Sequence, residues 1–215
     1  TNYISLQVEY LLENNFNVTI ITTKHDKKLK EIESIKNLKI IRSKPNIKIS
    51  RGFFSINLVN EFKKNSKLHD YIFVHYPMTE IGLLAPLFPS NKTFLFYHCL
   101  PTFEKFFLKF FNIYFSFFSF ISIYLSKKVI FLSIDYAKNL ILPKNTEKKF
   151  FELPPYVKIN NYKKKINSTF KIGYLGRLSF EKNLELLIDV SKKLIKVGII
   201  HELQIAGDDK DIRFL

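Results

Sequence analysis

The segment GYLGRLSFEKN, at 173–183, brings glycines and cations together. Gly176 ends an apolar run that predicts a strand, Arg177 follows directly, and Lys182 is expected in the first turn of the next helix. Ligands of open α/β sheets bind at the carboxyl ends of strands, and the positive end of a helix adds its field to nearby cations. Glycine lets the backbone approach a ligand closely. These residues therefore predict a site for an anion such as a phosphate.

The two cations are not equally informative. The chain has only four arginines, so Arg177 at a strand end is distinctive, whereas lysine is abundant. Lys182 taken alone could equally be an incidental lysine in a solvated turn. No cysteine cluster or His-Glu-x-x-His pattern is present. The sequence therefore indicates no metal site, and we expect no cofactor.

Two histidines also end predicted strands, His75 in DYIFVHYP and His98 in TFLFYHCLP. Histidine can donate or accept a proton near neutral pH, which makes a strand-end histidine a candidate for chemistry. The alternative is a ring whose hydrogen bonds are satisfied by the backbone. We interpret His75 as structural and keep both interpretations of His98. His25 and His201 are expected on the surface.

The elements that must position these residues alternate between strands and helices. Apolar runs predict strands at 17–23, 38–43, 70–77, 93–101, 128–133 and 148–155. Helices are expected at 5–15, 53–67, within 103–128, and at 134–142. Continuous apolar strands separated by helices are typical of a parallel sheet covered on both faces. The fold class is therefore α/β.

A break in composition divides the chain. A polar, basic and aperiodic stretch follows the Pro-Pro pair at 154–155, and four of the six glycines lie after it. The pattern then restarts with a strand at 170–176, a helix to about residue 197 and a strand at 201–207. We expect a first domain at 1–157, a linker at 158–169 and the start of a second domain at 170–215.

The second unit resembles the start of the C-terminal domain of the family-four retaining glycosyltransferases. Their pattern is an apolar strand, Gly-Arg, a Glu-Lys-Gly turn, a Leu- and Ile-rich helix, and a second strand ending in glycine. The matching residues are Gly176, Arg177, Leu178, Glu181, Lys182, Leu187, Ile188, Leu203, Ile205 and Gly207. Asn183 stands where the family usually has glycine, which is a mild departure because asparagine tolerates similar backbone angles. Asp208 and Asp209 replace the usual x-Gly after Gly207, which leaves that loop in doubt.

The resemblance implies a GT-B fold of two Rossmann-like domains, the second truncated here, and transfer of a sugar from a nucleotide-sugar donor with retention. Arg177, Lys182 and Gly176 would bind the donor diphosphate, with Glu181 and Gly207 in the same cleft. Negative charge grows on the diphosphate as the glycosidic bond breaks, so two fixed cations can stabilise it without a metal. The implied acceptor is a lipid-linked molecule or a saccharide.

A weaker resemblance extends into the first domain. The family commonly has a strand beginning with Asp and ending near His, which 70–75 matches, and a later strand ending in His, which His98 matches. By this match His98 is the catalytic-site histidine facing the donor sugar across the cleft between the domains.

Both ends of the sequence look cut, since it starts at Thr1 and stops in a loop after Gly207. Compared with the family, the first strand with its Gly-rich loop and most of the second domain would be absent. We therefore expect two unpaired strand edges in the first domain and exposed apolar surface in the second. Residues 1–215 alone are expected to be inactive.

The charge balance suggests a second class of function. With 34 Lys and Arg against 19 Asp and Glu, the net charge is +15, which favours phosphates, acidic lipid surfaces or nucleic acid. The alternative function is therefore a basic, non-catalytic protein that binds a membrane or nucleic acid. No recognisable nucleic-acid motif is present, so no specific nucleic acid is expected. Cys99 is the single cysteine, which favours a reducing compartment and a cytoplasmic location.

The segment 103–128 is unusually aromatic. Its polar residues recur every three or four positions and form a narrow stripe, while the apolar arc is wider than one sheet face needs. A transmembrane helix is disfavoured because the flanking strands should share one sheet. Two interpretations remain open. One is a core helix with many aromatics, and the other is a helix in peripheral contact with an anionic membrane, at the inner face of the cell membrane.

Overall fold

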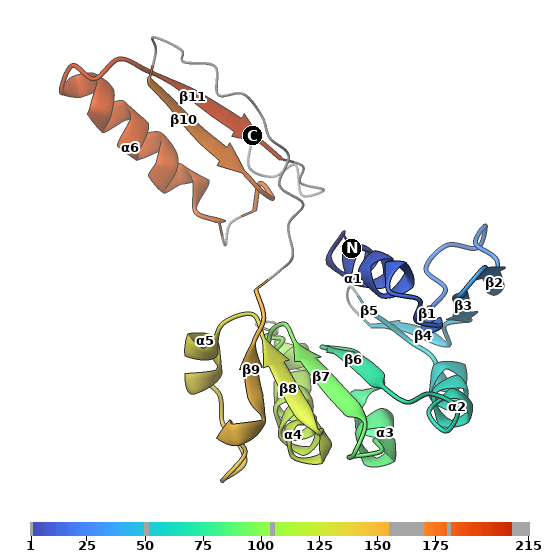
Figure 1. Cartoon of the computed structure of the whole chain (residues 1–215). Coiled ribbons are helices and arrows are strands. Elements are labelled where there is room, and N and C mark those ends of the chain that lie inside the picture. The colour runs from blue at the N-terminus through green and yellow to red at the C-terminus, as the bar shows by residue number, and fades with distance from the viewer. Residues whose placement is uncertain (1, 50–51, 104–105, 155–169, 180–181, 208–215) are drawn as a thin grey trace. The chain divides into compact units, whose positions relative to one another are not determined.

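The computed structural model describes residues 2–49, 52–103, 106–154, 170–179 and 182–207. The chain divides into two compact units, Thr1–Lys158 and Ile159–Leu215 (Figure 1). The expected linker, 158–169, lies outside the described residues. Each unit is described by itself.

The first unit begins with helix α1 (Asn2–Glu13) and a three-stranded sheet. Strand β1 (Val18–Thr23) pairs in parallel with β3 (Leu38–Ser43), and β2 (Ile32–Ile35) pairs antiparallel with β3. A short antiparallel pair, β4 (Ile47–Ile49) and β5 (Gly52–Phe54), then leads into helix α2 (Ile56–Asn65). The two parallel strands are the predicted ones. The sequence missed β2, β4 and β5, which are only three or four residues long. Phe53 and Phe54 of β5 were expected in the helix predicted at 53–67, which begins at Ile56 instead.

The second part of this unit is a four-stranded, all-parallel sheet in the order β6-β7-β8-β9. Its strands are β6 (Ile72–Tyr76), β7 (Thr93–Tyr97), β8 (Lys128–Phe131) and β9 (Phe150–Glu152). The connections contain α3 (Ile81–Leu84), η1 (Ala85–Leu87), η2 (Phe106–Leu108), α4 (Lys109–Leu125), α5 (Ile134–Lys138) and η3 (Glu147–Lys149). The predicted alternation of apolar strands and helices is confirmed here.

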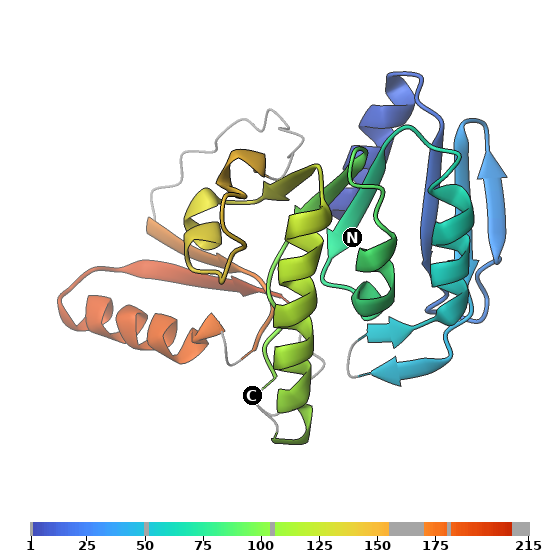
Figure 2. The ribbon, with the colours of Figure 1, turned by 90° about the horizontal axis from the view of Figure 1, so that it is seen from below.

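One face of this sheet forms the core of the unit. Side chains alternate along each strand, and Val74, Tyr76, Leu95, Tyr97, Val129 and Phe131 are all buried on the face that α3 and α4 cover (Figure 2). The Tyr76 hydroxyl donates to the Phe115 carbonyl oxygen at 2.9 Å, which ties β6 to α4. The buried phenol is therefore satisfied.

The opposite face is only partly covered, which corrects the expectation of helices on both faces. It carries Phe73, Phe94 and Phe96 in edge-to-face contact, and Phe73 and Phe151 remain 38% and 48% exposed. Lys128 places its ammonium 4.3 Å from the Phe151 ring centroid. Tertiary packing, rather than strand hydrophobicity, therefore decides which face is covered.

Helix α4 turns its serines inward. Ser119, Ser122 and Ser126 are buried, together with Phe115. Ser119 Oγ lies 2.9 Å from the Tyr97 hydroxyl, and Ser126 Oγ donates to the Ser122 carbonyl oxygen at 2.7 Å. Part of the predicted polar stripe thus faces the sheet, because small hydroxylated side chains permit close approach. No helix in the described part of the chain is long and apolar enough to cross a membrane.

The three-stranded and the four-stranded sheets of the first unit do not pair with each other. Within the described residues, β1 pairs only with β3, and β6 pairs only with β7. His69, just before β6, reaches β1, where its Nε2 lies 3.0 Å from Thr19 Oγ1. The two strand edges without a second partner agree with the expectation from the sequence.

The second unit contains one βαβ element. Strand β10 (Phe170–Leu175) pairs in parallel with β11 (His201–Ala206), and helix α6 (Leu184–Lys196) connects them. Gly198 has φ +83° just after α6, in the left-handed region where glycine commonly ends a helix. The whole molecule is therefore a mixed α/β protein with several parallel strand pairs.

Candidate functional site

The carboxyl ends of β6 and β7 bring two histidines together. The register pairs His75 with Phe96, and alternation along β7 places Phe96 and His98 on the same face. The His98 backbone N–H donates to the Tyr76 carbonyl oxygen at 3.0 Å, which continues the ladder past β7. Nδ1 of His75 consequently lies 3.0 Å from Nε2 of His98, with the rings 9° from parallel.

Burial keeps this pair uncharged. Burial and, to a smaller extent, the charge of His98 lower the pKa of His75 to about 4. Burial also lowers the pKa of His98. At neutral pH one imidazole therefore donates and the other accepts the shared hydrogen bond.

The position of the proton in this hydrogen bond determines whether Nδ1 of His98 can donate to a ligand or accept from it. When His75 donates, His98 carries its proton on Nδ1 and is a hydrogen-bond donor there. When His98 donates, its Nδ1 is an acceptor. No hydrogen bond to His98 Nδ1 is present among the described residues, so this nitrogen is the one able to contact a ligand.

Tyr3 of α1 closes one side of the pair. Its ring meets His98 edge-on, with centroids 5.6 Å apart and an interplanar angle of 85°, and it meets His75 at 6.3 Å and 76°. Burial raises the pKa of Tyr3. On the other side, Phe96 stacks on His75 with centroids 4.8 Å apart. The aromatic walls account for the desolvation of the two imidazoles.

Other polar groups lie along the same edge of the sheet. Tyr136 of α5 accepts a hydrogen bond from the Leu100 backbone N–H at 2.7 Å. Glu152, which ends β9, accepts one from the Ile134 backbone N–H at 3.2 Å. Cys99 is exposed beside His98, and partial burial raises the pKa of its thiol, so the thiol stays protonated at neutral pH. The carboxyl edge thus carries several polar groups besides the two histidines.

The structure adds a contact to the structural role expected for His75. Its ring directly contacts the candidate His98. A signal for this was present in the sequence, since both histidines end strands expected in one parallel sheet. Tyr3 had no comparable signal, because its position depends on where α1 packs.

The second unit holds the predicted anion-binding residues. The Gly176 backbone N–H donates to the Ala206 carbonyl oxygen at 3.0 Å, and a Cβ built on Gly207 would collide with the Gly176 carbonyl oxygen. Glycine is therefore required where the ends of β10 and β11 meet. Arg177 follows directly and is exposed, and its carbonyl oxygen accepts a hydrogen bond from the Tyr174 hydroxyl at 2.7 Å.

Lys182 lies just before α6 and not in its first turn. Its backbone N–H donates to the Ser179 carbonyl oxygen at 2.9 Å, and α6 begins at Leu184. Asn183 is the N-cap and has φ 48° and ψ 51°, the left-handed conformation that glycine adopts easily. Asparagine is therefore compatible with the backbone at this position, where the glycosyltransferases that the sequence resembles usually have glycine. Glu181 lies outside the described residues.

Two of the remaining histidines have structural roles. His69 bonds the Asn65 carbonyl oxygen at 2.8 Å through Nδ1, besides its contact with Thr19. His201 is partly exposed, and its ring contacts Ser191 Oγ at 2.7 Å through Nε2 and the Ile199 carbonyl oxygen at 3.1 Å through Nδ1. His25 is exposed as expected. Within the described ranges, no group of three or more His, Cys, Asp or Glu side chains could hold a metal ion.

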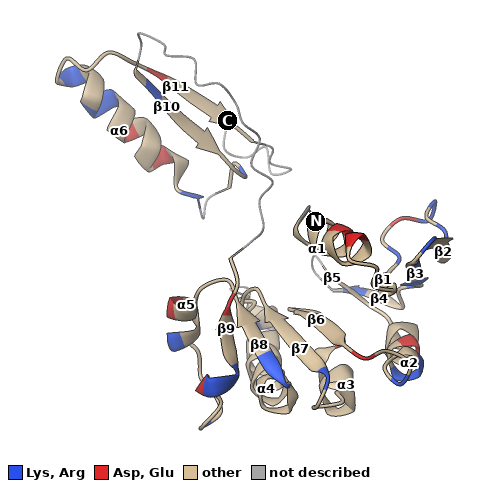
Figure 3. Cartoon of the chain, in the orientation of Figure 1, with Lys and Arg blue, Asp and Glu red and all other residues tan. Residues whose placement is uncertain are grey.

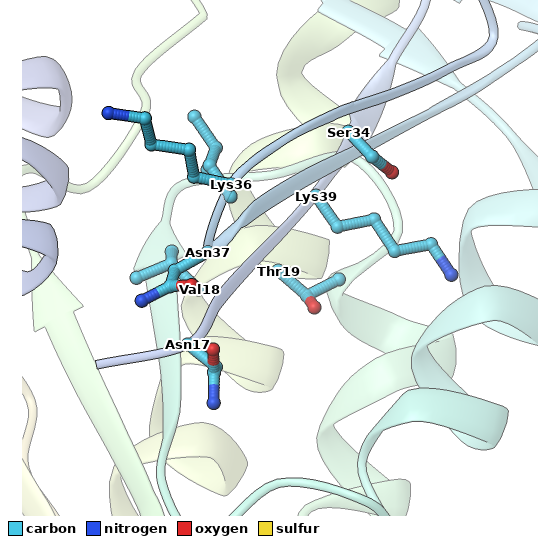
Figure 4. Close-up of a pocket in the computed structure, with 8 residues that line it drawn as sticks. Asn17, Val18, Thr19, Ser34, Lys36, Asn37 and Lys39 are labelled. Atoms are coloured by element: carbon cyan, nitrogen blue, oxygen red, sulfur yellow. The ribbon is translucent and has the colours of Figure 1, made fainter. Parts of the chain in front are cut away.

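A pocket lies at the amino ends of β1 and β3, which is the edge opposite to the usual ligand edge of a parallel sheet. Its lining residues are Asn17, Val18, Thr19, Ser34, Lys36, Asn37, Leu38 and Lys39. Lys36 and Lys39 extend in opposite directions (Figure 4). Their charges do not converge on one point, so the pocket offers no focused anion site.

Comparison of the chain with models of protein families and with curated proteins found no match. The resemblance to glycosyltransferases therefore rests on the motif residues themselves. The structure defines two candidate groups, the His75–His98 pair in the first unit and the Arg177 turn in the second.

Proposed function

We propose that this protein is a retaining glycosyltransferase of GT-B type that moves a sugar from a nucleotide-sugar donor to a lipid-linked or saccharide acceptor. The observation that carries the proposal is the turn after β10. Arg177 directly follows Gly176, whose carbonyl oxygen lies so close to Gly207 that only glycine fits there. Lys182 directly precedes Asn183, which has the left-handed backbone conformation. This combination of residue type and backbone conformation suits a bound diphosphate.

The chemistry assigned to the turn is stabilisation of the leaving group. As the glycosidic bond breaks, negative charge increases on the diphosphate oxygens. The planar guanidinium of Arg177 can bind two of these oxygens at once, and the flexible Lys182 ammonium can follow the charge. The backbone N–H groups at the start of α6 add a favourable dipole.

The role proposed for His98 is a contact with the donor sugar. Its Nδ1 can donate to or accept from a sugar hydroxyl, depending on which partner carries the proton of the His75 bond. The pair lies at the carboxyl edge of a parallel sheet, where ligands of such sheets bind. Partial desolvation strengthens hydrogen bonds made there.

Titration with nucleoside diphosphates tests the proposal. UDP, GDP and ADP are titrated separately into the protein, and we expect one or more to bind. Arg177→Ala or Lys182→Ala should weaken this binding by about 10- to 100-fold, the loss of a charge-assisted hydrogen bond. Lys196→Ala is the matched control, because it removes an equal charge from the last turn of α6 and should leave affinity unchanged.

Two results would contradict the proposal. One is normal diphosphate affinity in both single variants, and the other is the absence of binding by the wild-type protein. Salt-sensitive binding to DNA without any diphosphate binding would instead favour the basic, non-catalytic alternative.

A further inference from the structure

The outer side of α4, together with Phe106 of the preceding η2, carries a row of large apolar side chains, which we call the α4 stripe. It consists of Phe106, Phe110, Ile113, Phe117, Phe120 and Tyr124, and they are 39–88% exposed. Their spacing alternates between four and three residues, which places them on one side of a helix. At 1.5 Å per residue the stripe is about 27 Å long.

Packing against the sheet prevents the helix from burying this stripe. The opposite side of α4 is fixed by buried Phe115, whose carbonyl oxygen binds the Tyr76 hydroxyl, and by Ser119, which contacts Tyr97. Rotation of the helix would break these buried hydrogen bonds, which is costly. The stripe is therefore a fixed external surface of the first unit.

The surroundings of the stripe are basic. Helix α4 contains no acidic residue, whereas Figure 3 shows acidic residues on α1, α2, α5 and α6. Lys109 is exposed in the first turn. Lys149 donates to the Tyr124 carbonyl oxygen at 2.7 Å, with its ammonium 5.6 Å from the Tyr124 ring centroid. Cations thus flank both ends of an apolar surface.

We propose that the α4 stripe docks the protein on an anionic lipid surface. The helix lies parallel to the membrane, its aromatic side chains enter the boundary between headgroups and acyl chains, and the lysines contact lipid phosphates. A second copy of the chain fits less well, because each copy carries a net charge of +15 and paired helices favour Leu, Ile and Val over Phe at their contact. Vesicle binding requires no sugar donor, so the proposal is independent of the proposed function.

Flotation with vesicles tests this surface. The protein should float with vesicles of phosphatidylcholine and phosphatidylglycerol, less so at high salt, and not with phosphatidylcholine alone. The double variant Phe110→Ser, Phe117→Ser should lower partitioning by about tenfold or more. Tyr10→Ser with Phe16→Ser is the matched control, since both residues are exposed aromatics outside the stripe.

A fluorescence measurement detects contact of the stripe with lipid without replacing an apolar side chain by a polar one. The chain has no tryptophan, so Phe117→Trp introduces a single probe. Its emission should shift to the blue with phosphatidylglycerol vesicles, whereas Phe16→Trp should not respond. The proposal is overturned if wild-type protein ignores anionic vesicles, binds neutral ones equally, or binds unchanged in the double variant. It is also overturned if the stripe instead holds a dimer that the double variant dissociates.

Discussion

The buried imidazole of His75 gives the first unit a specific sensitivity to acid. Its folded-state pKa is about 4, below the ordinary value of about 6.5 for an unfolded chain. Between these values the unfolded state binds a proton that the folded state does not. The free energy of unfolding therefore falls as the pH decreases from about 6.5 to about 4.

We expect His75→Gln to remove much of this sensitivity. On going from about pH 7 to about pH 4.5, the wild-type protein should lose about 2 kcal/mol more unfolding free energy than the variant. Urea denaturation at both pH values measures the difference. His25→Gln, at an exposed position, should lose as much as the wild type. Identical acid losses in wild type and His75→Gln would refute the burial argument.

At the scale of elements, the close contact between the ends of β10 and β11 requires that residue 207 has no side chain. We expect Gly207→Ala to destabilise the second unit by about 1–3 kcal/mol, because its Cβ would overlap the Gly176 carbonyl oxygen. Gly173→Ala is the control, since a Cβ there has nothing within 4 Å. Chemical denaturation of both variants measures the contrast. Equal free energies of unfolding for the Gly207→Ala and Gly173→Ala variants would show that the ends of β10 and β11 can separate without loss of stability.

The same element determines the geometry of the proposed diphosphate site. The loop of Arg177 starts where Gly176 bonds Ala206, so separation of the strand ends would also displace the arginine backbone. Gly207→Ala should consequently weaken diphosphate binding, although Gly207 itself carries no charge.

At the scale of the whole molecule, the two units differ in how much they bury. The first contains a continuous buried cluster around β6, β7 and β8. In the described part of the second, Ser191 is the one buried residue, while Leu175, Val197 and Ile200 are 71–88% exposed. The expectation of exposed apolar surface in this unit is confirmed. Because the second unit buries little apolar surface, little hydrophobic free energy is available to offset the entropy lost when its chain becomes ordered.

Hydrogen exchange should therefore differ between the units. We expect amides of β10, α6 and β11 to exchange faster than those of β6, β7 and β8, because local opening of the second unit exposes little additional apolar surface. Mass spectrometry of exchanged peptides measures this. Equal protection of the two sets would show that the second unit is as stable as the first.

The sequence by itself determined which segments form the parallel strands. Strands of a parallel sheet are rich in apolar residues, so β1, β3, β6, β7 and β8 were visible as short, mostly apolar runs. The Gly-Arg strand end was visible for a similar reason, because few residue types suit a close backbone approach beside an anion. Short strands such as β2 were not visible, since their pairing comes from a neighbour rather than from their own composition.

Only the tertiary structure decided which side chains meet. The contact between His75 and His98 depends on the register of β6 against β7, and a shift of one residue would place one imidazole on the other face. The side of α4 that faces the sheet was likewise decided by packing, since both its serines and its aromatics recur at helical spacing. Periodicity defines the two faces of a helix, but the space available against the sheet selects which of them is buried.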